Sequence, residues 1–253
     1  MHASPSISKA VVTGHSRGLG AAIARQLLER GIAVLGVARR PHAGLAAQYG
    51  AQLAQVELDL SDVPRTAQWL AGGELARFLD GASQVLLVNN AGRVGPAGKL
   101  DVVDMGGIAQ TVSVNVTAPL MLSAAFAAAT TGASDRRIVH VSSGAGRHVL
   151  PGASLYCATK AALDHHARSV AADGDPTLRI CSLAPGVIDT DMQTEIRSTS
   201  LERMPMREKF DALKRDGLLD TPEHAARKLV GYLLNEAFGQ APVADTREVV
   251  APQ

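Results

Sequence analysis

A strand, a glycine-rich turn and a helix follow one another near the start of the chain, and this succession constrains the fold most. Residues 10–13 predict a short buried strand, residues 14–20 (GHSRGLG) a tight turn, and residues 21–30 a helix ending at Gly31. Glycines let the backbone approach a pyrophosphate, and a helix N-terminus offers unpaired N–H groups. The stretch indicates a dinucleotide site, although its TGxxxGxG spacing differs from GxGxxG and a turn without a ligand has a similar sequence.

Apolar runs alternate with helical patterns along the rest of the chain. Strands are expected at 33–38, 53–60, 84–88, 138–141 and 178–183. Helices are expected at 43–49, at 64–79 with a break at Gly72-Gly73, and at 101–111, 113–130 and 154–172. Such alternation is typical of βαβ crossovers with a parallel sheet. The predicted fold is a single α/β domain over residues 1–253, a doubly wound parallel sheet of the Rossmann type between two helical layers.

Polar residues gather at the carboxyl ends of the predicted strands, where doubly wound sheets place their sites. The residues at these ends are Thr13, Arg39, Asp59, Asn89, Ser143 and Ala184. We therefore expect the functional site along this edge of the sheet.

The composition excludes several classes of protein. Lysine and arginine number 25 against 24 acidic residues, so no charge excess favours nucleic acid or a membrane surface. Cys157 and Cys181 form no CxxC pair, which favours a reduced, cytoplasmic protein. No apolar run is expected to reach the ~20 residues of a membrane span. No spacing of histidines predicts a metal site.

Tyr156 and Lys160 stand four residues apart in the predicted helix 154–172, so they share one face. We expect the lysine cation to lower the tyrosine pKa toward the working range, where the phenol can exchange a proton. The YxxxK spacing is common among surface residues of helices. It gains meaning here from Ser143, at the end of a strand, which could hold a substrate carbonyl oxygen beside the phenol.

Taken together, these features resemble the short-chain dehydrogenase/reductase family in its single-domain form. The matching motifs are residues 13–20, Asn89 to Gly92, Asn115, Ser143, Tyr156 with Lys160, and Pro185-Gly186 followed by Thr190. The resemblance implies that Tyr156 donates the proton in carbonyl reduction and that Lys160 binds the nicotinamide ribose. It also implies that Ser143 polarises the carbonyl and that Asn115 holds a water next to Lys160. Ser143 is preferred over Ser142 because the family places its serine thirteen residues before the tyrosine.

The same resemblance implies a set of residues that bind the cofactor. They are Gly14, Ser16, Arg17, Gly18, Leu19, Gly20, Arg39, Asp59, Leu60, Asn90, Ala91, Gly92, Tyr156, Lys160, Pro185, Gly186, Val187 and Thr190. His15 lies in the same turn, where it could flank the phosphates.

Charge near the adenosine ribose indicates which cofactor is used. Ala38 stands where NAD enzymes usually carry an acidic residue, Arg39 follows it, and Arg17 lies in the glycine turn. Two guanidinium groups suit a 2′-phosphate, so NADP(H) is expected in preference to NAD(H). In the alternative interpretation, Arg39 and Arg40 merely end a strand at the surface. Asp59 is expected to accept a hydrogen bond from the adenine amino group.

The last third of the chain has a more specific pattern, carried by residues 155–160, residues 184–193, Met206, Phe210 and residues 218–220. In these residues it resembles sepiapterin reductase and the benzil-reductase-like proteins. A substrate flap is expected at about 187–217. Within it, Met192, with Met206 as a second candidate, is expected either to form an apolar wall of the substrate pocket or to pack in the core. The expected substrate contacts are Ser143, His148, Tyr156 and Met192. Asp245 is the nearest candidate for the aspartate that anchors the pterin in sepiapterin reductase.

The sequence therefore predicts an NADPH-dependent carbonyl reductase acting on a ketone, a diketone or a pterin side chain. One alternative is a 3-oxoacyl-carrier-protein reductase, for which Arg147, Arg197, Arg203 and Arg207 could form a basic patch. Another is a non-catalytic NADP(H)-sensing protein, although such proteins typically lack the tyrosine or lysine that this chain retains. The family resemblance implies a homodimer or homotetramer, and the partner is expected to be a small carbonyl compound, with no nucleic acid and no membrane.

Overall fold

The computed structural model describes residues 7–249, so the first six and last four residues of the predicted domain lie outside it. Seven strands form one sheet in the order β3-β2-β1-β4-β5-β6-β7, and every neighbouring pair is parallel. The strands are β1 (Ser8–Thr13), β2 (Ala33–Ala38), β3 (Leu53–Glu57), β4 (Gln84–Asn89), β5 (Asp135–Val141), β6 (Leu178–Ala184) and β7 (Val243–Asp245). The strand order reverses between β1 and β4, which confirms the doubly wound fold and places its crevice at their carboxyl ends.

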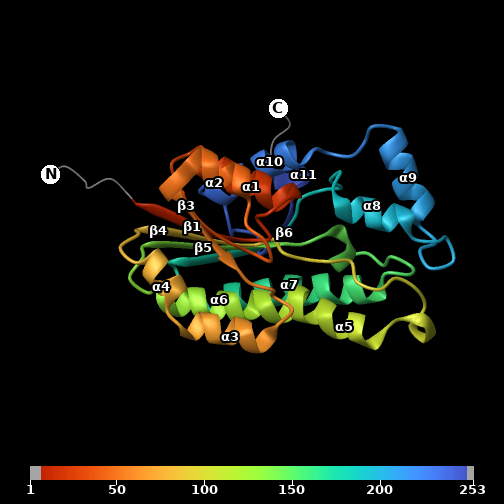
Figure 1. Cartoon of the computed structure of the whole chain (residues 1–253), viewed down its shortest axis with the longest axis horizontal. Helices are drawn as coiled ribbons and strands as arrows, with labels where there is room; N and C mark the ends of the chain where they lie inside the picture. Colours follow the sequence, from red (N-terminus) through yellow and green to blue (C-terminus); the bar gives the residue numbers. More distant parts are fainter. Residues whose placement is uncertain (1–6, 250–253) are drawn as a thin grey trace.

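Helices cover both faces of the sheet (Figure 1). One layer contains α1 (Gly18–Leu28), α2 (Ala43–Tyr49), α10 (Pro222–Leu234) and α11 (Thr246–Val249). The other contains α3 (Val63–Ala71), α4 (Glu74–Leu79), α5 (Met105–Val112), α6 (Ala118–Ala129) and α7 (Ser154–Ala172). Two further helices, α8 (Asp191–Ser198) and α9 (Arg207–Arg215), stand to one side of these layers at the end of the sheet where β6 leads into them.

The near-continuous apolar strands explain the two cores. Successive residues of β1 point to opposite faces, so Val12 packs with Ile23 of α1, whereas Val11 packs with Leu122 and Phe126 of α6. All five side chains are fully buried. Removing an apolar side chain of this size from water stabilises a fold by about 1.5–3 kcal/mol. The sheet is thus held on both faces, which fixes the position of its carboxyl edge.

The third strand ends earlier than the expected residue 60. β3 stops at Glu57, and Asp59 then begins a turn in which its Oδ1 accepts hydrogen bonds from the backbone N–H and hydroxyl of Ser61. Aspartate and serine favour such turns because their side chains satisfy nearby backbone groups. Asp59 and Leu60 therefore lie in a loop just beyond the strand.

The two helices expected at 101–111 and 113–130 are one continuous helix from Met105 to Ala129, with a π-helical segment at Ser113–Thr117. It begins after Asp104, whose carboxylate accepts hydrogen bonds from the N–H groups of Gly106 and Gly107. By length and composition this helix could cross a membrane, so the expectation that no apolar stretch is long enough is wrong here. Its second half, α6, packs on β4 and β5 inside the helical layer.

The seventh strand has no counterpart among the predicted elements. β7 contains three residues and pairs with the end of β6, at Ser182 to Ala184. Three residues are too few to show an alternating pattern. This strand nevertheless places Asp245 at the carboxyl edge of the sheet.

Candidate active site

The glycine turn is tied to the end of β4. The Thr13 hydroxyl accepts hydrogen bonds from the backbone N–H groups of Asn90 and Ala91, both at 2.9 Å, and the Asn90 amide donates to the Thr13 carbonyl oxygen. A Cβ on Gly20 would lie 2.1 Å from the carbonyl oxygen of Gly14, so only glycine fits there. The predicted residues of this turn therefore lie side by side with Asn90 and Ala91.

The start of α1 is suited to an anion. Gly18, Leu19 and Gly20 form its first turn, which carries no acidic residue and receives no side-chain cap from Arg17. Free N–H groups at a helix N-terminus bind phosphate through hydrogen bonds and the helix dipole. This end of α1, at the switch point of the sheet, fits the pyrophosphate of a dinucleotide.

His15 does not flank the phosphate position as expected. Its side chain is fully buried, with Nε2 2.7 Å from the Gln55 Oε1 of β3. The ring lies against Gly36 of β2, where a Cβ would approach it to 2.5 Å. His15 is therefore a packing residue beneath the turn, and Gly36 makes the space for it.

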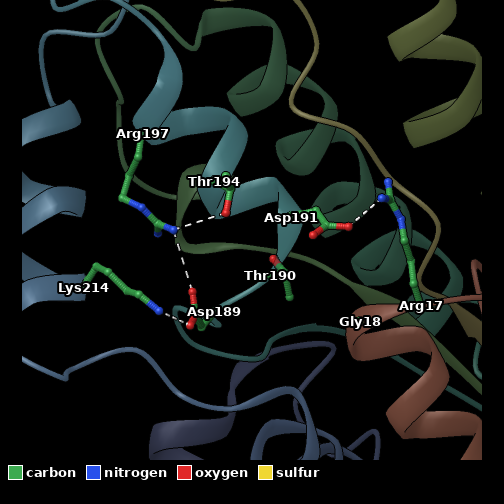
Figure 2. A pocket seen from close by; sticks show the side chains of 8 residues that line it. All are labelled: Arg17, Gly18, Asp189, Thr190, Asp191, Thr194, Arg197 and Lys214. Carbon is green, nitrogen blue, oxygen red and sulfur yellow. Dashed lines mark hydrogen bonds and ion pairs between the residues drawn. The ribbon is translucent and has the colours of Figure 1, made fainter.

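The two arginines expected at the ribose have different surroundings. Arg39 is exposed just after β2, and its charge acts on Asp59. Burial raises the pKa of Asp59, but the hydrogen bonds from Ser61 and the charges of Arg39 and Arg93 outweigh it and lower the pKa overall. Arg17 points instead toward α8, where it pairs with Asp191 (Figure 2).

A polar cavity of about 590 Å³ separates the glycine turn from α8. It is lined by Arg17, Gly18, Asp189, Thr190, Asp191, Thr194, Arg197 and Lys214. Within it, Asp189 pairs with both Lys214 and Arg197 (Figure 2). A second cavity of about 370 Å³ is bounded in part by Pro185, Gly186 and Val187. The predicted cofactor residues after β6 thus border open space.

Lys160 and Asn115 meet beside Gly92. Lys160 is buried on α7, and its Nζ donates to the Val141 carbonyl oxygen of β5 at 2.7 Å. Asn115 lies in the π-helical segment, a feature frequent at functional sites, and donates to the carbonyl oxygen of Arg93 and the Thr159 hydroxyl. A Cβ on Gly92 would lie 3.5 Å from Asn115 Oδ1 and 3.7 Å from Lys160 Nζ.

Tyr156 stands next to Lys160 and Ser143. The Lys160 Nζ lies 5.6 Å from the centroid of the tyrosine ring, and the Tyr156 hydroxyl is hydrogen-bonded to Ser143. The neighbouring Ser142 donates its hydroxyl to Asp164 at 2.7 Å. The two adjacent serines therefore have different partners, and of the two it is Ser143 that faces the phenol.

The pKa values of this pair differ from the expectation. Burial raises the pKa of Tyr156 to about 12, against the opposing hydrogen bond with Ser143. Burial lowers the pKa of Lys160 to about 8, against the opposing charge of Asp164. The expected lowering of the tyrosine pKa by lysine is therefore wrong in this structure. The phenol keeps its proton at neutral pH, which is the state that a proton donor needs.

An apolar cluster joins Tyr156 to the segment after β6. Its buried members are Val94, Ala153, Ile196 and Met204, and Leu150, Tyr156, Met192 and Phe210 pack against them. Met192 lies in this cluster as predicted, but the buried second methionine is Met204, whereas Met206 is half-buried. Phe210, in α9 within the expected flap, also packs here, although it is not among the expected substrate contacts. His148 is exposed, with its ring beside Gly144.

The Asp245 carboxylate is already paired. Asp245 is buried at the end of β7 and accepts hydrogen bonds from the backbone N–H and guanidinium of Arg247, with Nη2–Oδ2 at 2.6 Å. The structure therefore shows no free carboxylate at this position. Across residues 7–249, no three His, Cys, Asp or Glu side chains gather where they could hold a metal ion.

This fold and this site define a class of oxidoreductase. A model of the short-chain dehydrogenases matches residues 8–201, and the chain belongs to this family. It is therefore an oxidoreductase of carbonyl or alcohol groups, and the family uses a nicotinamide cofactor.

The relatives are similar along almost the whole chain. Benzil reductase ((S)-benzoin forming) of Bacillus cereus is 35% identical over 240 residues, which cover 92% of this chain and 96% of that protein. Sepiapterin reductase of Mus musculus is 34% identical over 245 residues, covering 90% and 92%. The crystal structure of a short-chain dehydrogenase/reductase from Burkholderia vietnamiensis shares 49% identity with a TM-score of 0.71, covering 97% and 100%. The predicted family and the resemblance to these two reductases are confirmed.

Proposed function

We propose that the protein is an NADPH-dependent reductase of a ketone, a diketone or a pterin side-chain carbonyl. The observation that carries this proposal is the position of the protonated Tyr156 phenol. It lies between Ser143 and Lys160 and beside the apolar cluster, at the edge of the sheet that bears the glycine turn. Proton donation to a carbonyl oxygen needs this phenol in this state.

Each residue of the site has one task in this proposal. Tyr156 gives its proton to the carbonyl oxygen, and the Ser143 hydroxyl donates a hydrogen bond to the same oxygen as charge develops on it. Lys160 binds the nicotinamide ribose, and Asn115 holds a water next to the ammonium. The nicotinamide supplies the hydride when it is bound. The first turn of α1 would hold its pyrophosphate, and Thr190, whose methyl group lies 3.7 Å from the position of a Cβ on Gly18, would lie beside it.

The preference for NADP(H) is supported by charge at the end of β2. Ala38 provides no carboxylate there, and the exposed Arg39 follows it. A 2′-phosphate is attracted to guanidinium groups, whereas the ribose hydroxyl of NAD is usually held by an acidic side chain. Arg17 stands nearby in the turn, although its guanidinium is engaged by Asp191.

The substrate class is supported by the apolar cluster around Tyr156. Met192 and Phe210 pack in it beside the phenol, and Leu150 faces it from the loop before α7. Large apolar groups next to the reacting carbonyl suit an aryl or alkyl diketone or a flat heterocycle. The names of the relatives, benzil reductase and sepiapterin reductase, agree with both choices.

The basic patch expected for an acyl-carrier-protein reductase is largely neutralised. Arg147 pairs with Asp164, Arg197 with Asp189, and Arg207 with Asp211. Only Arg203 of the four arginines has no acidic partner among the ion pairs of the described residues. This arrangement favours a small carbonyl substrate over an acidic carrier protein.

A screen of NADPH oxidation against 1,2-diketones, sepiapterin-like pterins, 3-oxoacyl thioesters and quinones tests the proposal. We expect turnover with a diketone or a pterin. The Tyr156→Phe variant should bind NADPH normally but lose turnover by about 10²–10⁴-fold, the usual contribution of a positioned proton donor. Unimpaired turnover by this variant would show that the proton donor is another group. Turnover of 3-oxoacyl thioesters alone would favour the carrier-protein reductase.

A further inference from the structure

A buried carboxylate lies one helical turn beyond Lys160. Asp164, 1% exposed on α7, accepts hydrogen bonds at Oδ1 from the hydroxyls of Ser142 and Ser182, both at 2.7 Å. Its Oδ2 accepts one from Arg147 Nε at 3.1 Å. The three donors come from the end of β5, from β6 and from the loop before α7. A buried charge with this many partners is strongly fixed, since removing it would leave polar groups unsatisfied.

The partners of Asp164 belong to the loop that carries Ser143. Ser142 precedes Ser143 directly, and Arg147 follows it by four residues and also donates to the Ala244 carbonyl oxygen of β7. Between them, Gly146 packs so closely that a Cβ there would lie 3.0 Å from the Asp164 Oδ2. The carboxylate thus holds the loop on both sides of the serine that touches Tyr156.

The same carboxylate acts on the buried ammonium. Asp164 opposes the lowering of the Lys160 pKa that burial causes. The other groups around Lys160 supply no counter-charge: the Tyr156 phenol and Asn115 are neutral, and the His140 imidazole of β5 is neutral because burial lowers its pKa to about 3. Asp164 itself faces Arg147 and the Cys181 thiol of β6, whose pKa burial raises to about 12.

We propose that Asp164 is a positioning residue of the carbonyl site: it holds the Ser143 loop through Ser142 and Arg147 and gives the buried Lys160 ammonium its counter-charge. This inference deepens the proposed function and rests on it, because Ser143 and Lys160 have their assigned tasks only in a reductase. The hydrogen bonds of the Asp164 carboxylate go to Ser142, Ser182 and Arg147 and not to the phenol, so it acts on the site through Ser143 and Lys160.

The pH dependence of cofactor binding tests this role without a substrate. The dissociation constant of NADPH is measured by fluorescence across neutral and alkaline pH for the full-length protein and four variants. In Asp164→Asn, the pH at which affinity falls should decrease by about one unit, because Lys160 loses its proton more easily without an opposite charge nearby. In Arg147→Gln, the Asp164 carboxylate no longer pairs with an arginine, so its negative charge acts more strongly on Lys160. The pH at which NADPH affinity falls should therefore increase.

Two further variants separate charge from packing. Ser182→Ala removes one hydrogen bond to Asp164 but no charge, so its pH profile should match that of the unmutated protein. Asp164→Glu keeps the charge, so the pH dependence of its NADPH affinity should be close to that of the unmutated protein. The kcat of Asp164→Asn, measured below the pH at which affinity falls, should be reduced because the Ser143 loop is released.

Each outcome decides the proposal. Opposite shifts in Asp164→Asn and Arg147→Gln support it, and unchanged profiles in both overturn it and leave Asp164 a structural residue only. If Asp164→Asn does not fold, the shift in Arg147→Gln decides alone. A protein that binds NADPH with these shifts but reduces no carbonyl refutes the proposed function and leaves the counter-charge role standing.

Discussion

Arg17 and Asp191 form an ion pair at the polar cavity between the glycine turn and α8, with 2.5 Å between Nη1 and Oδ2. Arg17 immediately precedes α1, whereas Asp191 lies in the first turn of α8, so the pair joins the glycine turn to the segment after β6 (Figure 2). Both side chains are exposed, 69% and 72%, and such pairs contribute at most about 1 kcal/mol to stability. The pair therefore matters less for folding than for what Arg17 can bind.

Asp191 should compete with the cofactor phosphate for Arg17. We expect Asp191→Asn to tighten NADPH binding by about two- to fivefold, which corresponds to the ~0.5–1 kcal/mol of an exposed ion pair. Affinity for NADH should stay unchanged, because it lacks the 2′-phosphate. Isothermal titration with both cofactors measures this. Asp189→Asn is the matched control, since Asp189 lines the same cavity but pairs with Lys214 and Arg197. An equal gain for NADH would show that Arg17 faces another part of the cofactor.

Arg39 should determine which cofactor is preferred. We expect Arg39→Asp to weaken NADPH binding by about tenfold or more, because a charge-assisted contact with the phosphate becomes a repulsion. The same change should improve the ratio of NADH to NADPH turnover. Arg40→Asp, at the adjacent exposed position, serves as the control for a general loss of positive charge. Equal use of both cofactors by the unmutated protein would contradict the argument.

The sequence predicted the sheet and most of the site because their signals are local. Strand patterns fix β1, β2 and β4, and the residues expected to act together stand at strand ends or one turn apart on α7. Their meeting beside Gly92 follows from the parallel topology, which brings the ends of β4 and β5 next to each other. The adjacent Ser142 and Ser143 have different partners in the structure, Asp164 and Tyr156 respectively.

The features that the sequence did not predict depend on distant contacts. His15 lies beneath the turn because Gly36 leaves space in β2, and neither residue reveals the other by spacing. Asp191, which forms an ion pair with Arg17, lies 174 residues further along the chain. The raised pKa of Tyr156 reflects burial beside the apolar cluster, which outweighs the opposing hydrogen bond with Ser143. A sequence pattern relates residues that are neighbours along the chain, whereas these effects arise between segments that only folding brings together.

Met204 should control the order of the segment after β6. Its side chain is 2% exposed and packs with Val94, Ala153 and Ile196, so truncation leaves a cavity. Met204→Ala should destabilise this cluster by about 2–3 kcal/mol, at the lower end of buried methionine truncations. Because Tyr156 packs against this cluster, the KM for the carbonyl substrate should rise several-fold. The thermal midpoint of unfolding should also fall. Met206→Ala, at a half-buried position, should leave both nearly unchanged, and equal effects in the two variants would contradict this assignment.

His140 should make the protein sensitive to acid. It is fully buried, with its Nδ1 3.1 Å from the Asn89 amide nitrogen and its Nε2 3.0 Å from His166 Nδ1. Burial lowers the pKa of His140 to about 3, and the charges of His166 and Lys160 act in the same direction. The unfolded chain takes up this proton near its ordinary pKa of 6.5, whereas the folded protein does not. The contribution of the neutral His140 to the free energy of unfolding is therefore complete above about pH 6.5. It is lost at up to about 1.4 kcal/mol per pH unit as the pH falls toward 3.

Urea unfolding at several pH values between about 7 and 5 tests this effect in the His140→Gln variant, because glutamine cannot take up the proton. The variant should have a lower free energy of unfolding at neutral pH, since glutamine fits the imidazole's place less well. Its free energy should fall less steeply with acid than that of the unmutated protein. Some dependence remains, because burial also lowers the pKa of His15 and His166. His165→Gln, at the exposed position next to His166 on α7, is the control, and its free energy of unfolding should change with pH as that of the unmutated protein does. Parallel curves for His140→Gln and the unmutated protein would show that His140 takes up its proton at about the same pH in the folded and unfolded states, despite its burial between β5 and α7.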